Sequence, residues 1–412
     1  MCTIVRMGID VRVRPARADQ QARAAVAVLF LTNGALFANL IPRYPEIKAG
    51  IGIENAVYGL AVAAFPTGAI LAGLAAATLI RRFGSAKVAV AGTILTSLGV
   101  IAAGLAPSIV AFTAGLFFAG AMDAITDVAQ NTHGLRVQRR YGRSIINSFH
   151  AVWSIGAVLG GSMAAGAIAL DLPIGVHLGV SAAVFSTVSV VALRSCLPGR
   201  DEVTEDKAAP DAETPRTSLR ATLSPRIVFV IIALVLIAIA GTIVEDAGNS
   251  WAALYLSGPL NAPAALAATG YIALVGAQFV GRLIGDRLVD RFGQRAVARA
   301  GGLIAAVGMG LALAFPTIPG TVLGFAAAGL GVATLVPAAM HEADELPGLR
   351  PGTGLTIVSW LMRLGFLLSP PLVGFVADAS ELRIGLMVVP IAGALVVVLA
   401  GILRARPNRT VS

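Results

Sequence analysis

The sequence predicts an all-α membrane protein in which twelve transmembrane helices form two pseudo-symmetric six-helix bundles. Three observations lead to this prediction. They are the residue composition, twelve apolar runs of membrane-spanning length, and a sequence repeat that relates the two halves of the chain.

The composition is that of a chain that folds in lipid. Apolar residues make up 57% and charged residues 13% of the 412 positions. Soluble domains carry about 25% charged residues, and disordered chains are rich in polar and charged residues. The two cysteines, Cys2 and Cys196, lie far apart, which excludes a disulfide scaffold. A polytopic membrane protein remains.

Twelve runs are long enough to span a bilayer as helices, which takes about 20 mostly apolar residues. They are continuously apolar, whereas the strands of a membrane barrel would alternate. In the first half of the chain the runs are 24–42, 56–80, 86–105, 108–133, 145–170 and 174–194. In the second half they are 226–256, 264–287, 296–315, 318–340, 353–377 and 384–403.

The cations predict the orientation of these helices. With both termini in the cytoplasm, 26 of the 31 Lys and Arg residues fall in cytoplasmic segments and three fall in outer loops. This asymmetry is typical of bacterial membrane proteins. We therefore expect a multi-pass protein of the inner (plasma) membrane with cytoplasmic termini. The net charge of +9 does not indicate nucleic-acid binding, because the cations lie at the ends of apolar runs.

The chain divides at a polar segment, residues 195–225, which contains four prolines and ten charged residues. We interpret it as a solvated cytoplasmic linker. The expected organisation is an N-terminal tail (1–23), a first bundle (24–194), the linker (195–225), a second bundle (226–404) and a C-terminal tail (405–412). Residues 1–23 lack the apolar core of a cleavable signal peptide.

A repeat supports this division. Leu-Ile-Arg-Arg-Phe-Gly at 79–84 matches Leu-Val-Asp-Arg-Phe-Gly at 288–293, which lies 209 residues later. The same offset relates Gly156 to Gly365. Duplicated helix bundles are the plan of many secondary transporters.

With twelve runs, a charged central linker and the sequence Asp290-Arg291-Phe292-Gly293-Gln294-Arg295 after the eighth run, the chain resembles the major facilitator superfamily over about residues 24–404. Further segments resemble a bacterial inner-membrane branch whose substrates are poorly assigned. They are 127–131, 139–143, 148–151, Glu245 with Trp251, and 369–374. The resemblance implies two bundles that move a small molecule by alternating access.

The chain departs from the family pattern at several positions. Arg81 replaces the loop aspartate in the first half, so the family's loop-gating role carries over to Asp290 alone. Ser250 stands where the branch often has an acid, and Arg363 replaces a tyrosine. The fifth run lacks the Gly-Pro pair that is typical of drug/proton antiporters, which disfavours that function.

Ionisable residues inside the runs are the candidate functional residues, because placing a charge at bilayer depth costs about 2.5–3.5 kcal/mol on insertion scales. Asp123, Asp127 and Asn131 share one face of the fourth run. They form either a cavity stripe that binds substrate or carries protons, or a helix-packing network with an arginine.

His150, in the fifth run, is either a proton relay or an interhelical hydrogen-bond partner. Glu245 and Asp246 point about 100° apart, so we do not expect both to face one cavity, and Glu245 is the stronger candidate. Trp251 fits an interfacial belt better than a substrate platform. Asn33, in the first run, binds solute or joins helices.

Arg363 lies about ten residues into the eleventh run and has no charged counterpart in the first half. It binds a substrate anion, pairs with Asp123 or Asp127, or does both. A second polar group at the cytoplasmic end of the eighth run predicts a gate that stabilises one access state. Its members are Arg282, Asp286, Asp290, Arg291 and Arg295.

The predicted function is a secondary active transporter, and not an enzyme, because no catalytic, metal-binding or nucleotide-binding pattern occurs in the sequence. We expect a small polar or amphiphilic solute as cargo and protons as the coupling ion, with Asp127, Glu245 or His150 as carrier. Membrane lipid is the expected surrounding, and a monomer the expected state, with no cofactor and no nucleic acid. The alternatives are an exporter of drug-like compounds or metabolites, and a membrane sensor on the same fold that does not transport.

Overall fold

The computed structural model describes residues 16–142, 145–199, 225–346, 349 and 352–404. Within these residues all regular secondary structure is helical, and twelve segments are long and apolar enough to cross a membrane. The predicted fold class is therefore confirmed.

Six of the membrane-length segments form the first half of the chain. Its elements are α1 (Arg17–Ala38), η1 (Ile41–Arg43), α2 (Tyr44–Ile51), α3 (Asn55–Val62), α4 (Ala64–Phe83), α5 (Ser85–Gly104), α6 (Ile109–Tyr141), α7 (Ile146–Ala169) and α8 (Ile174–Leu193). Helix α1 begins at Arg17, within the segment that we predicted as the N-terminal tail. Residues 1–15 lie outside the described part.

The second half contains the other six segments. Its elements are α9 (Pro225–Ser257), α10 (Ala264–Phe292), α11 (Gln294–Ala314), α12 (Ile318–Val332), α13 (Leu335–Asp344), α14 (Thr353–Leu361), α15 (Arg363–Ala379), α16 (Leu382–Gly385), α17 (Val388–Leu399) and η3 (Ala400–Ile402). Most of the predicted linker and all of the predicted C-terminal tail fall outside the described residues.

Large apolar side chains cover the outside of the bundle. Leu74 of α4, Val110 of α6 and Val398 of α17 are each at least 74% exposed. Such surfaces are unfavourable in water and suit the hydrocarbon of a bilayer. The protein is a multi-pass membrane protein.

The repeat has a counterpart in the backbone. Gly84 immediately precedes α5 with φ of 86° and ψ of 145°, and Gly293, 209 residues later, immediately precedes α11 with φ of 84° and ψ of 155°. Side-chain-bearing residues rarely adopt this conformation, which explains why both copies of the loop have glycine there.

The pair Gly156 and Gly365 also serves one purpose in both halves. A Cβ on Gly156 would lie 2.2 Å from the carbonyl oxygen of Leu31, where α7 crosses α1. A Cβ on Gly365 would lie 2.0 Å from the hydroxyl of Thr242, where α15 crosses α9. Glycine allows equivalent helices to approach closely in each bundle.

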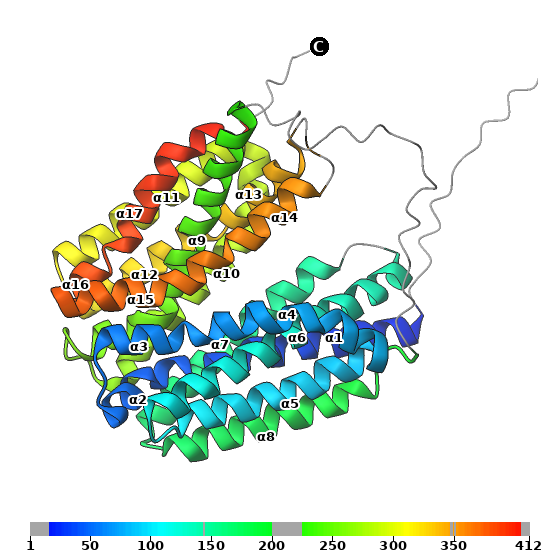
Figure 1. Ribbon diagram of the computed structural model, residues 1–412. Helices are drawn as coiled ribbons and strands as arrows, with labels where there is room; N and C mark the ends of the chain where they lie inside the picture. The colour runs from blue at the N-terminus through cyan, green and yellow to red at the C-terminus, as the bar shows by residue number, and fades with distance from the viewer. Residues whose placement is uncertain (1–15, 143–144, 200–224, 347–348, 350–351, 405–412) are drawn as a thin grey trace, which may run out of the picture.

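The two bundles meet at one end and diverge toward the other (Figure 1). We call the end that carries Asn55, Ser257 and Ala379 the loop end. The opposite end, which carries Arg17, Pro225 and Ile402, is the terminal end. At the loop end, α3 lies beside α15 and α7 packs on α10.

Glycines close this contact between the halves. A Cβ on Gly59 of α3 would lie 2.3 Å from the carbonyl oxygen of Pro370 in α15, and one on Gly374 would lie 2.4 Å from that of Asn55. The Tyr58 hydroxyl adds a hydrogen bond across the contact, donating to the backbone oxygen of Ser250 at 2.9 Å. The loop end is therefore closed in this structure.

Candidate functional site

A cavity of about 380 Å³ lies between the halves, directly below the closed loop end. Its polar and charged lining consists of Asn33, Asp123, Glu245, Asp246, Asn249, Ser250, Gln278 and Arg363. Its aromatic lining consists of Phe37, Tyr44, Phe65, Trp153, Tyr271 and Phe366. No cluster of His, Cys, Asp or Glu that could hold a metal ion occurs within the described ranges. The cavity can therefore offer hydrogen bonds, charge and aromatic faces to a solute.

Asn33 of α1 connects three helices at the wall of this cavity. Its side-chain amide donates a hydrogen bond to Asp123 Oδ1 of α6 at 2.8 Å. Its carbonyl oxygen accepts a hydrogen bond from Trp153 Nε1 of α7, also at 2.8 Å. The orientation of the Asn33 amide is thereby fixed, because exchanging its oxygen and nitrogen would lose both bonds. Asn33 thus joins helices, and it also lines the cavity.

Farther along α6, toward the terminal end, the predicted polar stripe continues through Asp127 and Asn131. The Asn131 amide donates to Asp127 Oδ1 at 3.0 Å. Its oxygen accepts from His150 Nε2 of α7 at 3.2 Å, because an amide oxygen can only accept. The His150 ring also meets Phe30 edge-on, with 5.2 Å between ring centroids. Asp127 and His150 are exposed in the space between the diverging halves.

Arg363 faces that space from the opposite half. Close contact of Gly365 with Thr242 fixes this face of α15 against α9, and the Thr242 hydroxyl donates to the backbone oxygen of Met362 at 3.0 Å. Arg363, two residues before Gly365, therefore points away from α9. Within the described part of the chain it has no carboxylate within 4.0 Å, although it interacts electrostatically with Asp127. A direct ion pair with Asp123 or Asp127 is not formed in this structure.

Glu245 of α9 has two partners on α10. Gln278 Nε2 donates to Glu245 Oε2 at 2.7 Å, and an Arg282 nitrogen lies 3.8 Å from the same oxygen. Arg282 was grouped with the gate from its sequence position, but it lies beside Glu245. Gln278 is buried, so Glu245 accepts its hydrogen bond from a side chain that is held inside the protein.

Asp246 lies at the closed end of the same cavity, so the expectation that Glu245 and Asp246 would not share a cavity was wrong. Both side chains line it although they lie about 100° apart on α9, because this face of the helix also contributes Asn249 and Ser250 to the lining. The belt interpretation of Trp251 was also wrong. Its side chain is fully buried and meets Tyr58 of the other half edge-on, with 5.0 Å between centroids.

The predicted gate residues lie at the terminal end of α10 and the start of α11. Asp286, Asp290 and Arg291 are exposed. Arg295 is held within its own half, where its Nε donates to the backbone oxygen of Leu403 at 2.9 Å. In this structure the gate residues thus lie where the halves are apart.

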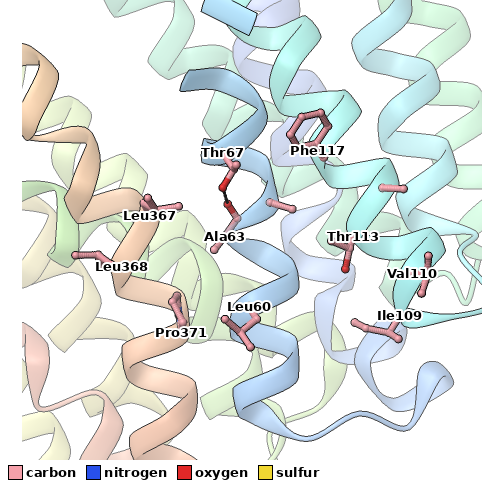
Figure 2. A pocket seen from close by; sticks show the side chains of 12 residues that line it. Leu60, Ala63, Thr67, Ile109, Val110, Thr113, Phe117, Leu367, Leu368 and Pro371 are labelled. Atoms are coloured by element: carbon pink, nitrogen blue, oxygen red, sulfur yellow. Dashed lines mark hydrogen bonds between the residues drawn. The ribbon is translucent and has the colours of Figure 1, made fainter. Parts of the chain in front are cut away.

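A second, larger hollow of about 840 Å³ lies on the outer surface between α3, α4, α6 and α15. Figure 2 shows its lining of aliphatic and aromatic side chains such as Leu60, Val110, Phe117 and Leu368. Its Thr67 hydroxyl is already bonded to the backbone oxygen of Ala63 at 2.7 Å. The hollow contains no charged group and faces the expected position of the lipid, so the smaller cavity is the better candidate for solute binding.

Sequence analysis missed several cavity residues. Gln278 and Asn249 are uncharged and escaped a search for ionisable residues, although an amide within an apolar helix is itself a signal. Trp153 lies one turn after His150 and could have been found by that spacing. The aromatic residues Tyr44 and Tyr271 carry no signal in the sequence, because aromatic residues in membrane helices mostly serve packing.

Comparison with known proteins agrees with the geometry. The family model for the Major Facilitator Superfamily matches residues 26–288 and 246–412. An uncharacterized transporter of Sinorhizobium fredii is 30% identical over 380 residues, which cover 92% of this chain and 97% of that protein. The D-xylose–proton symporter has a similar structure, with a TM-score of 0.71, 16% identity, and coverage of 95% of this chain and 98% of the symporter.

The structure of the nucleoside transporter NupG is also similar, with a TM-score of 0.69 and 14% identity over 94% of this chain and 98% of that one. At these identities the two structures support the fold alone, whereas the family model and the Sinorhizobium relative cover nearly the whole sequence. The chain therefore belongs to the Major Facilitator Superfamily, a family of membrane transporters.

Proposed function

We propose that this protein is a secondary active transporter that moves a small polar or amphiphilic solute by alternating access. The observation that carries the proposal is a polar, partly aromatic cavity between two halves that touch at the loop end and diverge at the terminal end. A binding site that is closed to one side and open to the other is what alternating access requires.

The proposed orientation places the terminal end in the cytoplasm of a bacterial cell, with the protein in the inner membrane. The support is the excess of Lys and Arg in the tails, the linker and the loops at that end. In this orientation the structure is an inward-open state. One chain encloses its own cavity, so we propose that the monomer is the functional unit.

Proton coupling is the proposed source of energy. Four titratable groups, Asp123, Asp127, His150 and Glu245, line the cavity or the space that leads from it to the terminal end. The three carboxylates have neutral amide partners, Asn33, Asn131 and Gln278, which can remain bonded to a carboxyl group in either protonation state.

The gate residues fit the inward-open state. Asp286, Asp290, Arg291 and Arg295 lie at the end where the halves are separated. We propose that they bind the facing ends of the first half when the terminal end closes, and so stabilise the outward-open state.

The test is flux in proteoliposomes. Purified protein is reconstituted with defined metabolite mixtures, a pH gradient is imposed in either direction, and the solutes that cross are identified by mass spectrometry. We expect gradient-dependent movement of at least one small solute, and its direction shows whether the protein imports or exports. Equal solute movement with protein-containing and empty vesicles, for all mixtures and both gradients, would count against transport and favour a sensor.

A further inference from the structure

Asp246 occupies an unusual position among the carboxylates. It lies where α9 meets the other half at the closed loop end, and it is only 8% exposed. The other candidate carboxylates are more exposed and line the cavity or the open space below it. Separation of the halves at the loop end would open this contact, so the environment of Asp246 depends directly on the access state.

The groups around Asp246 are neutral or acidic. Ser250 Oγ donates to its carboxylate at 3.4 Å, and Ser369 of α15 lies beside it, with its hydroxyl donating to the backbone oxygen of Ile243 at 3.3 Å. The titratable groups nearest to it are Glu245 on α9, Tyr44 on α2 and Tyr58 on α3, with Tyr271 of α10 next to Tyr44 and Glu245. Within the described residues no cation lies within 4.0 Å of Asp246.

Polar atoms without partners occur in the same region. Tyr44 Oη, Asn249 Oδ1 and Trp251 Nε1 are buried and form no hydrogen bond in the described structure. Buried polar groups are nearly always bonded, so these three atoms are positioned to bind water. Asn249 and Tyr44 line the cavity together with Asp246, which gives such water a path toward Glu245.

We propose that Asp246 carries the coupled proton and that its protonation state controls closure of the loop end. This proposal rests on the proposed function and assigns its coupling step to a residue outside the polar stripe of the cavity. With the loop end open, Asp246 takes a proton from outside water. The neutral carboxyl is then buried as the halves close.

In the inward-open state the proton leaves by way of cavity water beside Glu245. The negative charge that remains is buried beside acidic and neutral groups, with no cation within 4.0 Å in the described part of the chain. Burial of an uncompensated charge is strongly unfavourable, so loss of the proton drives the loop end open again. Each cycle thus moves one proton from outside to inside, without any change in covalent bonds apart from the O–H bond of Asp246.

The experiment measures loop-end closure against pH and needs no known substrate. Cys2 and Cys196 are replaced by Ser, and spin labels are attached at Ala49→Cys and Ser380→Cys, which are exposed on opposite halves at the loop end. Double electron–electron resonance is recorded between pH 5.5 and 8.5. We expect a short distance at low pH and a growing long-distance population at high pH, with a ratio that changes by up to about tenfold per pH unit for one linked proton.

Asp246→Asn should remove this pH dependence and leave the short distance throughout, because the amide is neutral at every pH. Glu381→Gln, which neutralises an exposed carboxylate at the same end, is the matched control and should respond as the wild type does. If Asp246→Asn is not monodisperse, Ser250→Ala with Ser369→Ala replaces it. Loss of the Ser250 donor and of the polar group at Ser369 should move the midpoint toward higher pH.

The other outcomes decide against the proposal. A pH response that survives Asp246→Asn and disappears in Glu245→Gln or Asp378→Asn assigns the proton to those groups. A response to Na⁺ at constant pH that Asp246→Asn abolishes makes the site a sodium site. A wild-type protein with no pH response contradicts proton coupling as a whole, whereas solute flux in proteoliposomes would still establish transport.

Discussion

Asp378 of α15 caps the first turn of α3 in the other half of the protein. Its carboxylate accepts hydrogen bonds from the backbone N–H groups of Asn55 and Ala56 at 3.0 and 2.7 Å, and from the Asn55 side-chain amide at 2.8 Å. Helix α3 has no side-chain cap of its own. A negative charge at a helix N-terminus is favourable, so the cap stabilises the closed loop end specifically.

We expect Asp378→Ala to open the loop end. Loss of an N-cap costs about 1 kcal/mol, which corresponds to about a fivefold change in the ratio of closed to open molecules. The measurement is the distance distribution between labels at residues 49 and 380. Asp171→Asn, an exposed acid in the loop between α7 and α8, is the control and should leave the distribution unchanged. A closed population as large in Asp378→Ala as in the wild type would show that the cap does not hold the gate.

Gly59 provides an independent test of the same contact. A Cβ there would lie 2.3 Å from a backbone oxygen of α15, which cannot move without displacing the helix. Gly59→Ala should therefore favour the open loop end, although alanine raises the intrinsic stability of the helix by about 1 kcal/mol. Gly73→Ala in α4 is the matched control, because its Cβ would meet no atom within 4 Å. If both variants keep the wild-type distances, the close approach of α3 and α15 is not needed for closure.

The fold could be predicted from the sequence because lipid imposes a simple rule on helix length and hydropathy. The repeat located Gly84 and Gly293 correctly, since both positions need a conformation that favours glycine. The site was predicted only in part. Asp123, Glu245 and Arg363 could be identified because charged residues are rare inside membrane helices. The neighbours that each of them contacts depend on how α6, α7, α10 and α15 pack, and this packing could not be derived from the sequence.

Asp246 and Trp251 show most clearly what could not be predicted from the sequence. Helical geometry correctly placed Glu245 and Asp246 about 100° apart, but both line the cavity together with Asn249 and Ser250 of the same helix. Trp251 lies near the end of a span, where belt residues are common, yet the other bundle covers it completely. Contacts between the halves have no periodic pattern, so they could not be derived from one helix at a time.

Cys196 should react slowly with maleimides. Burial raises the pKa of its thiol to about 11, and the thiolate is the reactive form. Relative to an exposed thiol with a pKa near 9, we expect labelling about a hundredfold slower at pH 7.5, with the rate rising with pH. N-ethylmaleimide labelling of a Cys2→Ser protein, followed by mass spectrometry, measures it. An introduced cysteine at exposed Lys87 is the control, and equal rates at the two sites would contradict the expectation.

Asp127→Asn should reduce solute flux without destabilising the protein. Asp127 is exposed between the halves, and its side-chain bond is to Asn131 on the same helix, so the isosteric amide leaves no buried group unpaired. We expect wild-type expression and monodispersity with flux in proteoliposomes lowered by at least about tenfold, the worth of one charge-assisted contact. Asp344→Asn, at the exposed end of α13, is the control for a carboxylate outside the cavity. Full flux in Asp127→Asn would remove this residue from the transport pathway.

Arg363 provides the test of the charge of the cargo. It lines the cavity and has no carboxylate within 4.0 Å in the described structure, so its guanidinium is available to a solute there. A charge-assisted contact is worth about 1.5–3 kcal/mol, so Arg363→Gln should weaken binding of an anionic cargo some ten- to hundredfold.

The melting temperature of the solute-free protein should remain near the wild-type value, because Arg363→Gln leaves no buried carboxylate unpaired. The measurement is a thermal-shift titration of wild type and Arg363→Gln with matched panels of carboxylated and uncharged solutes. Arg299→Gln, on the exposed surface of α11, controls for loss of a positive charge elsewhere. A fall in stability that Asp127→Asn restores would instead identify an internal ion pair formed outside the state seen here. A neutral solute that binds Arg363→Gln and wild type equally well would exclude recognition of a cargo anion by this residue.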